Sequence, residues 1–220
     1  MSDFLFDFRF EIIQDYFSLF MRGTLYTVGI SIAGIILGSI LGLLIAFGNM
    51  SRRWYLHWPT QGYIHLFRGT PLLLQIFVVH YGVVYAVTGH LDAITAAITA
   101  LALNSAAYTA EIYRAGILSL DKGQMEAALS LGMTRGQAMR HVILPQAIKR
   151  MIPAFGNEFI VLIKDSSLVA IIAAPELMYW AKAAYSQYLR IWEPYLFAAL
   201  IYLVLTYSLS KLLKFIERRM

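Results

Sequence analysis

Long uncharged runs dominate the hydrophobic pattern of this chain. Residues 23–51 contain no charged side chain, and an α-helix needs only about 20 residues to cross a hydrocarbon core. Similar runs cover residues 69–91, 93–110 and 194–210, and residues 151–174 form an apolar segment that contains Glu158, Lys164 and Asp165. The pattern predicts an all-α membrane protein with five transmembrane helices, at about residues 20–50, 60–88, 92–118, 151–174 and 193–214.

Composition supports a single membrane domain over residues 1–220. The chain is 59% hydrophobic and 14% charged, whereas soluble domains are about half apolar and about a quarter charged. Four acidic residues precede the first run, so we interpret it as a retained helix rather than a cleaved signal, which would begin with basic residues. Cysteine is absent, which excludes disulfides and thiolate metal sites.

The lysine and arginine residues predict the orientation, because positive charges near span ends stay on the cytoplasmic side. Five spans place the termini on opposite sides. The basic residues that fall on one side are Arg52, Arg53, Lys122, Arg135, Arg140, Lys149, Arg150, Lys211, Lys214, Arg218 and Arg219, and those on the other are Arg9, Arg22, Lys182 and Arg190. We therefore expect an N-terminus outside, a cytoplasmic C-terminus and a cytoplasmic loop over residues 119–150. Because the basic residues cluster in the loops on one side, the net charge of +5 reflects membrane orientation and does not indicate a nucleic-acid partner.

The first predicted helix carries a strip of small residues. Gly34, Gly38, Gly42 and Ala46 recur at every fourth position. Such a strip lets another helix approach closely. The partner helix can belong to this chain or to a second subunit, and we favour packing within the chain.

The loop at residues 119–150 is long enough to need structure of its own. Asp121 lies three residues before Gln124, which predicts a reciprocal cap and a short helix over residues 125–131 that ends at Gly132. Thr134 and Gln137 repeat this signature and start a second helix that runs towards Pro145. We therefore expect two short helices joined by a tight turn.

The first of these short helices has an unusual surface for a solvated element. Its exposed-looking face carries Ala127, Ala128 and Leu131, where charged residues would be expected. Small side chains would let another protein close over the backbone. An amphipathic helix that lies on the bilayer explains the same pattern equally well.

The spacing within this loop distinguishes the two interpretations. Residues 126–128 (EAA), Gly132 three residues later, and residues 143–145 (ILP) after a further ten resemble the EAA loop of binding-protein-dependent ABC importers. Residues 67–72 (FRGTPL), 107–116 (AYTAEIYRAG), 157–159 (NEF) and 164–168 (KDSSL) resemble the branch that transports polar amino acids. The resemblance covers about residues 20–185. This sequence differs from that branch at Ser166, where the branch usually has threonine.

This resemblance implies a role and partners. It implies a permease subunit of an amino acid importer in the bacterial cytoplasmic (inner) membrane, paired with a second permease subunit, an ATP-binding cassette ATPase dimer and an extracytoplasmic amino acid binding protein. ATP and Mg²⁺ would act on the ATPase, and this chain has no Gly-Lys-Ser/Thr phosphate-binding signature. In the family the first short helix docks on the ATPase, which implies docking residues Glu126, Ala127, Ala128, Leu131 and Gly132.

Four polar residues inside the predicted spans are candidates for substrate binding. Glu158 and Asp165 lie two helical turns apart on nearly the same face, and Asn104 and Glu111 share the same spacing. Charged groups inside a bilayer are costly unless they are paired or face an aqueous cavity. A basic substrate would relieve the repulsion between the two acids. Salt bridges within the helix bundle, for example between Glu111 and Arg114, would explain the carboxylates equally well. Neutral and acidic amino acids are therefore also possible substrates.

Other functions find less support in the sequence. The five histidines show no metal-binding spacing on a helix, and neither H-E-x-x-H nor G-x-S-x-G occurs, so we expect no metal, no catalytic residue and no enzyme activity in this chain. Arg68 is a candidate for gating or for anchoring at the interface, and Gly69 and Pro71 predict a non-helical entrance to the second span. A stand-alone amino acid channel or ion-coupled carrier stays as the alternative, although five unequal spans provide no inverted repeat.

Overall fold

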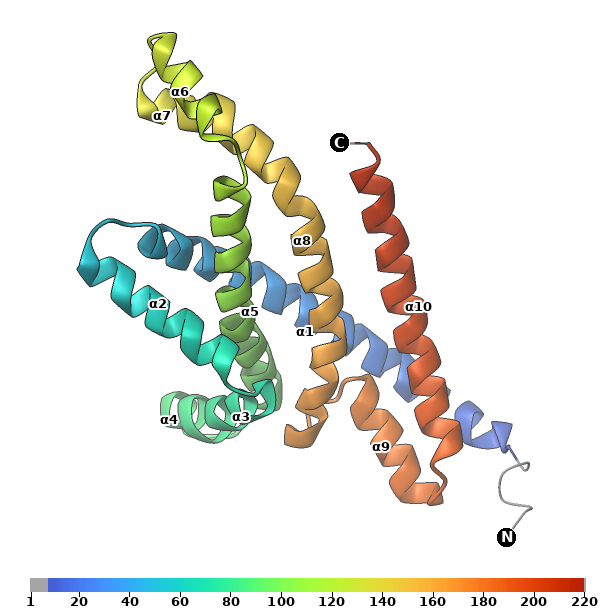
Figure 1. Cartoon of the computed structure of the whole chain (residues 1–220). Coiled ribbons are helices and arrows are strands. Elements are labelled where there is room, and N and C mark those ends of the chain that lie inside the picture. The colour runs from blue at the N-terminus through green and yellow to red at the C-terminus, as the bar shows by residue number, and fades with distance from the viewer. Residues whose placement is uncertain (1–7, 220) are drawn as a thin grey trace.

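The computed structural model describes residues 8–219, and within this range every regular element is a helix (Figure 1). The end of the last helix and the hairpin at residues 122–138 lie towards one end of the molecule, and the start of the first helix lies towards the other. The α-helices are α1 (Phe10–Asn49), α2 (Trp54–Gly69), α3 (Leu72–Phe77), α4 (Tyr85–Thr88), α5 (Ala93–Leu118), α6 (Lys122–Ser130), α7 (Arg135–Ala138), α8 (Leu144–Asp165), α9 (Leu177–Tyr188) and α10 (Trp192–Glu217).

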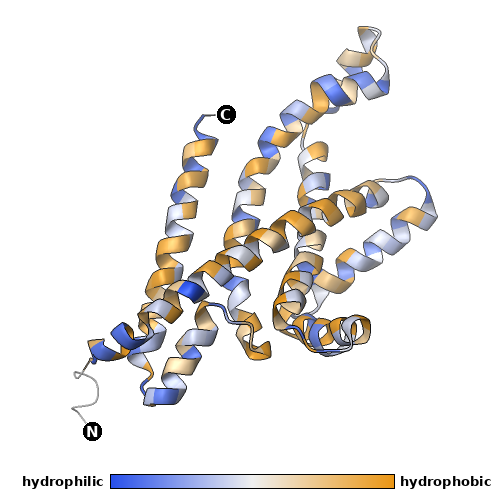
Figure 2. Cartoon of the chain, turned by 180° about the vertical axis from the view of Figure 1, so that it is seen from behind, coloured by the Kyte–Doolittle hydropathy of each residue, from blue (hydrophilic) through white to orange (hydrophobic). Residues whose placement is uncertain are grey.

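Three of these helices are long and apolar enough to cross a membrane on length and composition, namely α1, α5 and α10. The bent pair formed by α2 with α3 and α4 would make a fourth. Helix α8 carries several charged residues along its length, including Lys149, Arg150 and Glu158. The count of five spans and their sidedness therefore stay predictions. Apolar residues cover much of α1 and α10 (Figure 2), as expected for surfaces that face lipid or another subunit.

Helix α1 runs obliquely across the other long helices. It has 40 residues, so at a rise of about 1.5 Å per residue it is about 60 Å long, well beyond the thickness of a hydrocarbon core. Its most extensive contact within the described chain is with α5. The small-residue strip makes this contact: a Cβ added to Gly38 would lie 2.9 Å from Ser105 Cβ, and one added to Gly42 would lie 2.9 Å from the carbonyl oxygen of Ala106. The strip thus packs within the chain.

The second predicted span is broken. Helix α2 ends at Gly69, Thr70 and Pro71 are extended, and the helical segment that follows is inclined at 108° to α2. The predicted span at about residues 60–88 is therefore interrupted, and the expected non-helical backbone is present at Thr70 and Pro71, directly after Gly69. Buried side-chain hydrogen bonds hold the break, because Gln75 Nε2 donates to the carbonyl oxygens of Phe67 and Thr70.

Helix α5 begins where the sequence predicts, at a capped N-terminus. The Asp92 side chain accepts hydrogen bonds from the backbone N–H groups of Ile94 and Thr95 and from the Thr95 hydroxyl. These bonds, the side-chain bond from Thr95 first among them, lower the pKa of Asp92. The carboxylate therefore contributes stability above its unfolded pKa, and this contribution is lost as the pH falls through the lower folded value.

Replacing Asp92 with alanine removes this cap, and we expect a loss of about 1 kcal/mol at neutral pH. For a chain of this size that loss corresponds to about 2–4 °C in Tm. Thermal unfolding in detergent measures it, and the difference between wild type and variant should shrink below about pH 4, where free aspartate protonates. Asp92→Asn keeps a cap acceptor and should lose less. A pH-independent difference would contradict the role of the charge.

The predicted loop at residues 119–150 is only partly a separate hairpin. Helices α6 and α7 are the two expected short helices, and the Thr134 and Gln137 capping box is present. At Asp121 the expected reciprocal cap is not formed, because Asp121 accepts from Gly123 N–H while the Gln124 side chain accepts from Gln146. The second short helix runs to Pro145, as expected, and is not interrupted there. Helix α7 continues through a π-helical turn, Met139–Ile143, into α8 (Figure 1).

Pro145 does not end this helix, for a physical reason. Proline lacks a backbone N–H and crowds the preceding turn, and the wider π-helical turn directly before α8 accommodates both effects. The structure after the end of α8 at Asp165 also departs from the prediction. A 3₁₀-helix, Ser166–Ile172, follows α8, and Ala173 in the left-handed conformation (φ 61°) reverses the chain into α9, an element that the sequence analysis did not expect.

Candidate functional site

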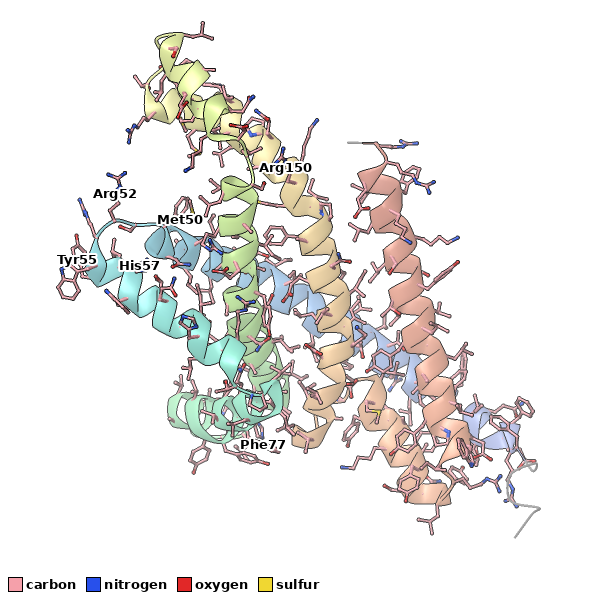
Figure 3. All side chains as sticks on the ribbon, in the orientation of Figure 1. Met50, Arg52, Tyr55, His57, Phe77 and Arg150 are labelled. Atoms are coloured by element: carbon pink, nitrogen blue, oxygen red, sulfur yellow. The ribbon has the colours of Figure 1, made fainter. Side chains whose placement is uncertain are left out.

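A cavity of about 680 Å³ lies between α5 and α8, next to the end of α2, and we call it the vestibule. It extends along the two helices from the end near the α6–α7 hairpin towards the middle of α8. Figure 3 labels Arg150, which lies on α8 near that hairpin end. The lining residues are Arg68, Tyr108, Glu111, Ile112, Ala115, Gly116, Ser119, Arg150, Met151, Ala154, Asn157, Glu158 and Val161.

Glu158 of α8 is the acidic group deepest in the structure among those that line the vestibule. Its residue is only 9% exposed, and none of the described lysines, arginines or histidines forms a salt bridge with it. The Ser105 hydroxyl of α5 and the amide-bearing Asn157 are its polar neighbours. A buried carboxylate without a cationic partner is costly in an apolar environment. Glu158 is therefore suited to receive a cation that enters the vestibule.

Asp165 is the last residue of α8 and does not line the vestibule. It is half-buried and forms no hydrogen bond or salt bridge with residues 8–219. It lies about two helical turns from Glu158 along α8, as the spacing predicts. The two acids thus belong to one face of α8, with Glu158 facing the cavity and Asp165 beyond it.

Glu111 of α5 lines the vestibule but is already paired. Arg114 donates three hydrogen bonds to its carboxylate, of 2.8, 3.1 and 3.2 Å, and an Arg68 nitrogen lies 3.9 Å from the same group. Asn49 at the end of α1 also donates to Glu111. A second cavity of about 530 Å³ lies between the end of α1, α2 and α5, and Arg68, Glu111 and Arg114 are among the residues that line it. Figure 3 shows Met50 and His57 at this place.

Asn104 of α5 is buried but does not join Glu111 in a common pocket. Its side-chain nitrogen donates to the Gln75 oxygen at 2.8 Å, and Gln75 in turn holds the break after α2. The spacing of Asn104 and Glu111 puts them on one helix face, but only Glu111 lines the vestibule. The structure thus gives Asn104 a structural contact that the sequence does not reveal.

The α6–α7 hairpin presents most of the predicted docking residues at its surface. Glu126 and Ala127 are exposed, and Leu131 is 85% exposed, which is unusual for a large apolar side chain outside a membrane helix. Ala128 is only 4% exposed, so the expectation that it belongs to the exposed face is wrong. It faces the rest of the hairpin, and its carbonyl oxygen accepts from Met133 N–H.

Gly132 ends α6 in the left-handed conformation, with φ of +83°. The backbone bonds around it, from Met133 to Ala128 and from Gly132 to Leu129, close the helix end. This conformation favours glycine because it has no side chain to collide with the backbone. The tight turn predicted at Gly132 is confirmed.

Residues 19–220 match the family described as "Binding-protein-dependent transport system inner membrane component". The chain belongs to this permease family. As the family description states, its members are inner membrane proteins, which agrees with the apolar helices of this permease.

Several curated relatives are similar to the permease over nearly their full length. The "Probable glutamine ABC transporter permease protein GlnM" of Bacillus subtilis is 41% identical, covering 96% of this chain and 97% of the relative. The "Arginine transport system permease protein ArtQ" of the same organism is also 41% identical, covering 97% of both chains. The "Glutamine transport system permease protein GlnP" of Escherichia coli is 36% identical, covering 97% of this chain and 98% of the relative.

Solved structures agree with this assignment. A chain of the "Crystal structure of an amino acid ABC transporter with histidines" superposes with a TM-score of 0.91 at 43% identity, covering 97% of the permease and 99% of that chain. A chain of the inward-facing MetNI methionine ABC transporter has a TM-score of 0.81 at 20% identity, covering 93% of the permease and 97% of that chain, which shows a common fold.

Sequence reasoning missed a buried acid at the other end of the permease. Glu176 is fully buried and caps α9 by accepting from the N–H groups of Met178 and Tyr179. It also accepts from the hydroxyls of Tyr202 on α10 and Thr27 on α1. Its position directly before an apolar run was the available signal for a helix start. This carboxylate is satisfied by its neighbours and joins three helices.

Metal ligands do not gather anywhere in the described part of the permease. Among residues 8–219 no group of three histidine, aspartate or glutamate side chains lies close enough to hold an ion. The polar side chains that line the vestibule are two carboxylates, the guanidinium groups of Arg68 and Arg150, the hydroxyls of Tyr108 and Ser119, and the Asn157 amide.

Proposed function

We propose that this permease forms the translocation pathway of an ATP-driven importer for a polar amino acid, with the vestibule as part of that pathway. The relatives named as glutamine and arginine permeases support an amino acid as the substrate class. The buried, unpaired Glu158 in the vestibule supports binding of a cationic group there. The α-amino group of any amino acid supplies one, and a basic side chain supplies a second.

The observation that best supports this function is the continuity between the vestibule and the hairpin. Helix α8 provides Glu158 and Asn157 to the vestibule and continues through the π-helical turn into α7. A movement imposed on the hairpin is therefore transmitted along one helix to the cavity. ATP hydrolysis in a partner would in this way open and close the vestibule.

The proposal includes the partners that such a mechanism needs. An ATP-binding cassette ATPase dimer would bind ATP and Mg²⁺ and contact Glu126, Ala127, Leu131 and Gly132 on the hairpin. A second permease subunit, the same or a homologous chain, would complete the pathway, and an extracytoplasmic binding protein would deliver the amino acid. Copurification of the tagged permease with an ATPase, and stimulation of that ATPase by an amino acid in the reconstituted complex, would test these assignments. A permease that transports without an ATPase would overturn them in favour of a stand-alone carrier.

For Glu158→Gln we expect arginine uptake to fall by at least about tenfold, because a charge-assisted hydrogen bond contributes about 1.5–3 kcal/mol and 1.4 kcal/mol corresponds to a factor of ten. Uptake of radiolabelled arginine into proteoliposomes measures this change. The matched control is Glu11→Gln, the same change at an exposed carboxylate near the start of α1. Glutamine uptake, measured in parallel, shows whether Glu158 selects a basic side chain or binds the α-amino group.

One outcome separates the role of Glu158 from the transport function. Unchanged uptake of both amino acids in the Glu158→Gln variant would remove Glu158 from the substrate site and leave the transport function in place. The same comparison with Asp165→Asn tests the second acid, which lies beyond the vestibule and should have a smaller effect.

A further inference from the structure

A third cavity lies between α1 and α5, away from the vestibule, and we call it the lateral groove. Its volume is about 560 Å³. The residues that line it are Arg22, Leu25, Tyr26, Gly29 and Ile30 of α1 and Ile94 and Ile98 of α5. None of them lines the vestibule or the second cavity. The lateral groove thus combines an apolar surface with one positive charge, that of Arg22.

The lateral groove lies beside the place where α1 crosses α5 (Figure 1). A Cβ added to Gly34 would lie 3.2 Å from Leu101 Cβ, and one added to Gly38 would lie 2.9 Å from Ser105 Cβ. Both contacts advance by one turn on each helix, so the two helices run in the same direction. Nearer the start of α1, a Cβ added to Gly29 would meet no atom within 4 Å. The groove therefore lies beyond the close contact, with open space at Gly29.

The sequence around the lateral groove orients it relative to a membrane. Arg22 is the last charged residue before the uncharged run at residues 23–51, and Asp92 holds the same position directly before α5. Because the two helices run in the same direction, both apolar stretches begin at this end of the groove. Arg22 therefore belongs at the level of the lipid headgroups, where arginine and tyrosine side chains are stable. Ile94 and Ile98 lie in the first two turns of α5, on the hydrocarbon side.

The two polar side chains of the lateral groove have no partner in the described part of the chain. Neither the Arg22 guanidinium nor the Tyr26 hydroxyl forms a hydrogen bond or an ion pair with residues 8–219. The two residues lie one helical turn apart on α1, so their side chains can reach the same ligand. A charge at the edge of the hydrocarbon core is costly unless it is paired or hydrated. Arg22 and Tyr26 thus provide donors for an anion.

The surface that continues from the lateral groove along α1 is apolar (Figure 2). Leu25 is 73% exposed, and the exposed apolar side chains that follow at one-turn intervals are Ile32, Ile36, Ile40 and Leu44. A contiguous surface of this kind contacts lipid or another protein. A protein helix would leave Arg22 unpaired unless it supplied an acid, whereas an anionic phospholipid supplies both acyl chains and a phosphate. Charge complementarity therefore favours the lipid.

We propose that the lateral groove binds one anionic phospholipid of the bilayer, with its phosphate at Arg22 and Tyr26 and an acyl chain along Leu25, Ile94 and Ile98. The planar fork of a guanidinium matches two phosphate oxygens in parallel hydrogen bonds. A lipid with a net negative charge binds better than a zwitterionic one, whose own ammonium group competes with Arg22 for the phosphate. The inference does not depend on which substrate the permease transports.

A cysteine introduced into the lateral groove reports on the lipid directly, because the chain has no cysteine of its own. The permease carrying Gly29→Cys is purified in detergent with the subunits that accompany it, and its labelling by N-ethylmaleimide is followed by mass spectrometry. We expect dioleoyl-phosphatidylglycerol to slow the labelling. Adding Arg22→Gln should raise the lipid concentration needed for half-protection by at least about tenfold, because a charge-assisted hydrogen bond is lost. Dioleoyl-phosphatidylcholine should protect only at higher concentrations.

Arg52→Gln is the matched control, because Arg52 is an exposed arginine in the turn that follows α1, far from Arg22 (Figure 3). It should leave the protection unchanged. Leu25→Cys is a second reporter in the groove, for use if Gly29→Cys does not fold.

Several results would overturn the inference. Equal weakening by Arg22→Gln and Arg52→Gln would show that surface charge alone attracts the lipid. Equal protection by the two lipids, or protection by neither, would remove the recognition of an anionic headgroup. If the introduced cysteine does not react in lipid-free detergent, a second subunit covers the lateral groove in place of a lipid. Each of these results leaves the proposed transport function standing, since uptake is measured separately.

Discussion

Replacing Gly132 with valine is expected to reduce ATP-driven uptake about 5- to 30-fold while the complex still hydrolyses ATP. The left-handed conformation at Gly132 costs an L-residue about 1–2 kcal/mol, and such a free energy corresponds to a factor of about 5–30 in the population of a conformation. An added Cβ would meet no atom within 4 Å, so the effect comes from the backbone alone. Uptake and ATP hydrolysis are measured on the same reconstituted preparation.

Two further variants sharpen this test. Gly132→Asn should retain most of the uptake, because asparagine tolerates the left-handed conformation at a helix end. Gly136→Val adds the same side chain to a glycine of α7 that has no positive φ and open space around it, and it should have the smaller effect. Normal uptake by Gly132→Val, with the protein present in the membrane at the wild-type level, would count against docking through this turn.

Replacing Gly42 with valine is expected to destabilise the permease more than any other substitution considered. The new Cβ would collide with the Thr109 hydroxyl and lie 2.9 and 3.0 Å from backbone atoms of Ala106 and Ala110. Backbone atoms of a helix cannot move aside as a flexible side chain does. Overpacking typically costs about 1–3 kcal/mol, and contacts with backbone on this scale place the variant at the upper end.

The measurement is the Tm of the detergent-solubilised protein together with its level in the membrane. Gly29→Val is the matched control, because Gly29 lies on the same helix with no atom within 4 Å of an added Cβ. For a chain of this length about 3 kcal/mol corresponds to a fall of about 6–12 °C in Tm. Equal Tm values for the two variants would show that α1 can move away from α5 without cost.

Local signals predicted the parts of the fold that local interactions determine. The start of α5 was predicted at Asp92, whose side chain caps the helix in the structure, and Gly132 ends α6 because its conformation suits glycine. The strip around Gly38 predicted a close helix contact because small residues permit one. Each of these features depends on residue types within one or two helical turns.

Features that depend on distant contacts were missed or only partly predicted. Gly69 and Pro71 indicated irregular backbone, but the angle of 108° depends on Gln75 and Asn104, which meet only in the folded chain. Pro145 suggested a helix end, whereas the π-helical turn before it lets the helix continue. Helix α9 is short, and its cap Glu176 is stabilised by hydroxyls from α1 and α10.

The same limit applies to the candidate site. Spacing placed Glu158 and Asp165 on one face of α8, but only the structure shows which of them lines the cavity. Arg114 was recognised as a partner for Glu111 because it lies one turn away. The approach of Arg68 from α2 is a tertiary contact, so only the structure shows that Arg68 borders both cavities and lies 3.9 Å from Glu111.

The glycine contact between α1 and α5 restricts how the vestibule can change shape. Along this contact the backbones touch with almost no side chain between them, and the Thr109 hydroxyl donates to the carbonyl oxygen of Gly38. Sliding or rotation of one helix against the other would force Cα atoms into carbonyl groups. The two helices therefore form one rigid frame, and in the proposed mechanism the displacement that admits and releases a substrate would fall to α8, at the opposite wall.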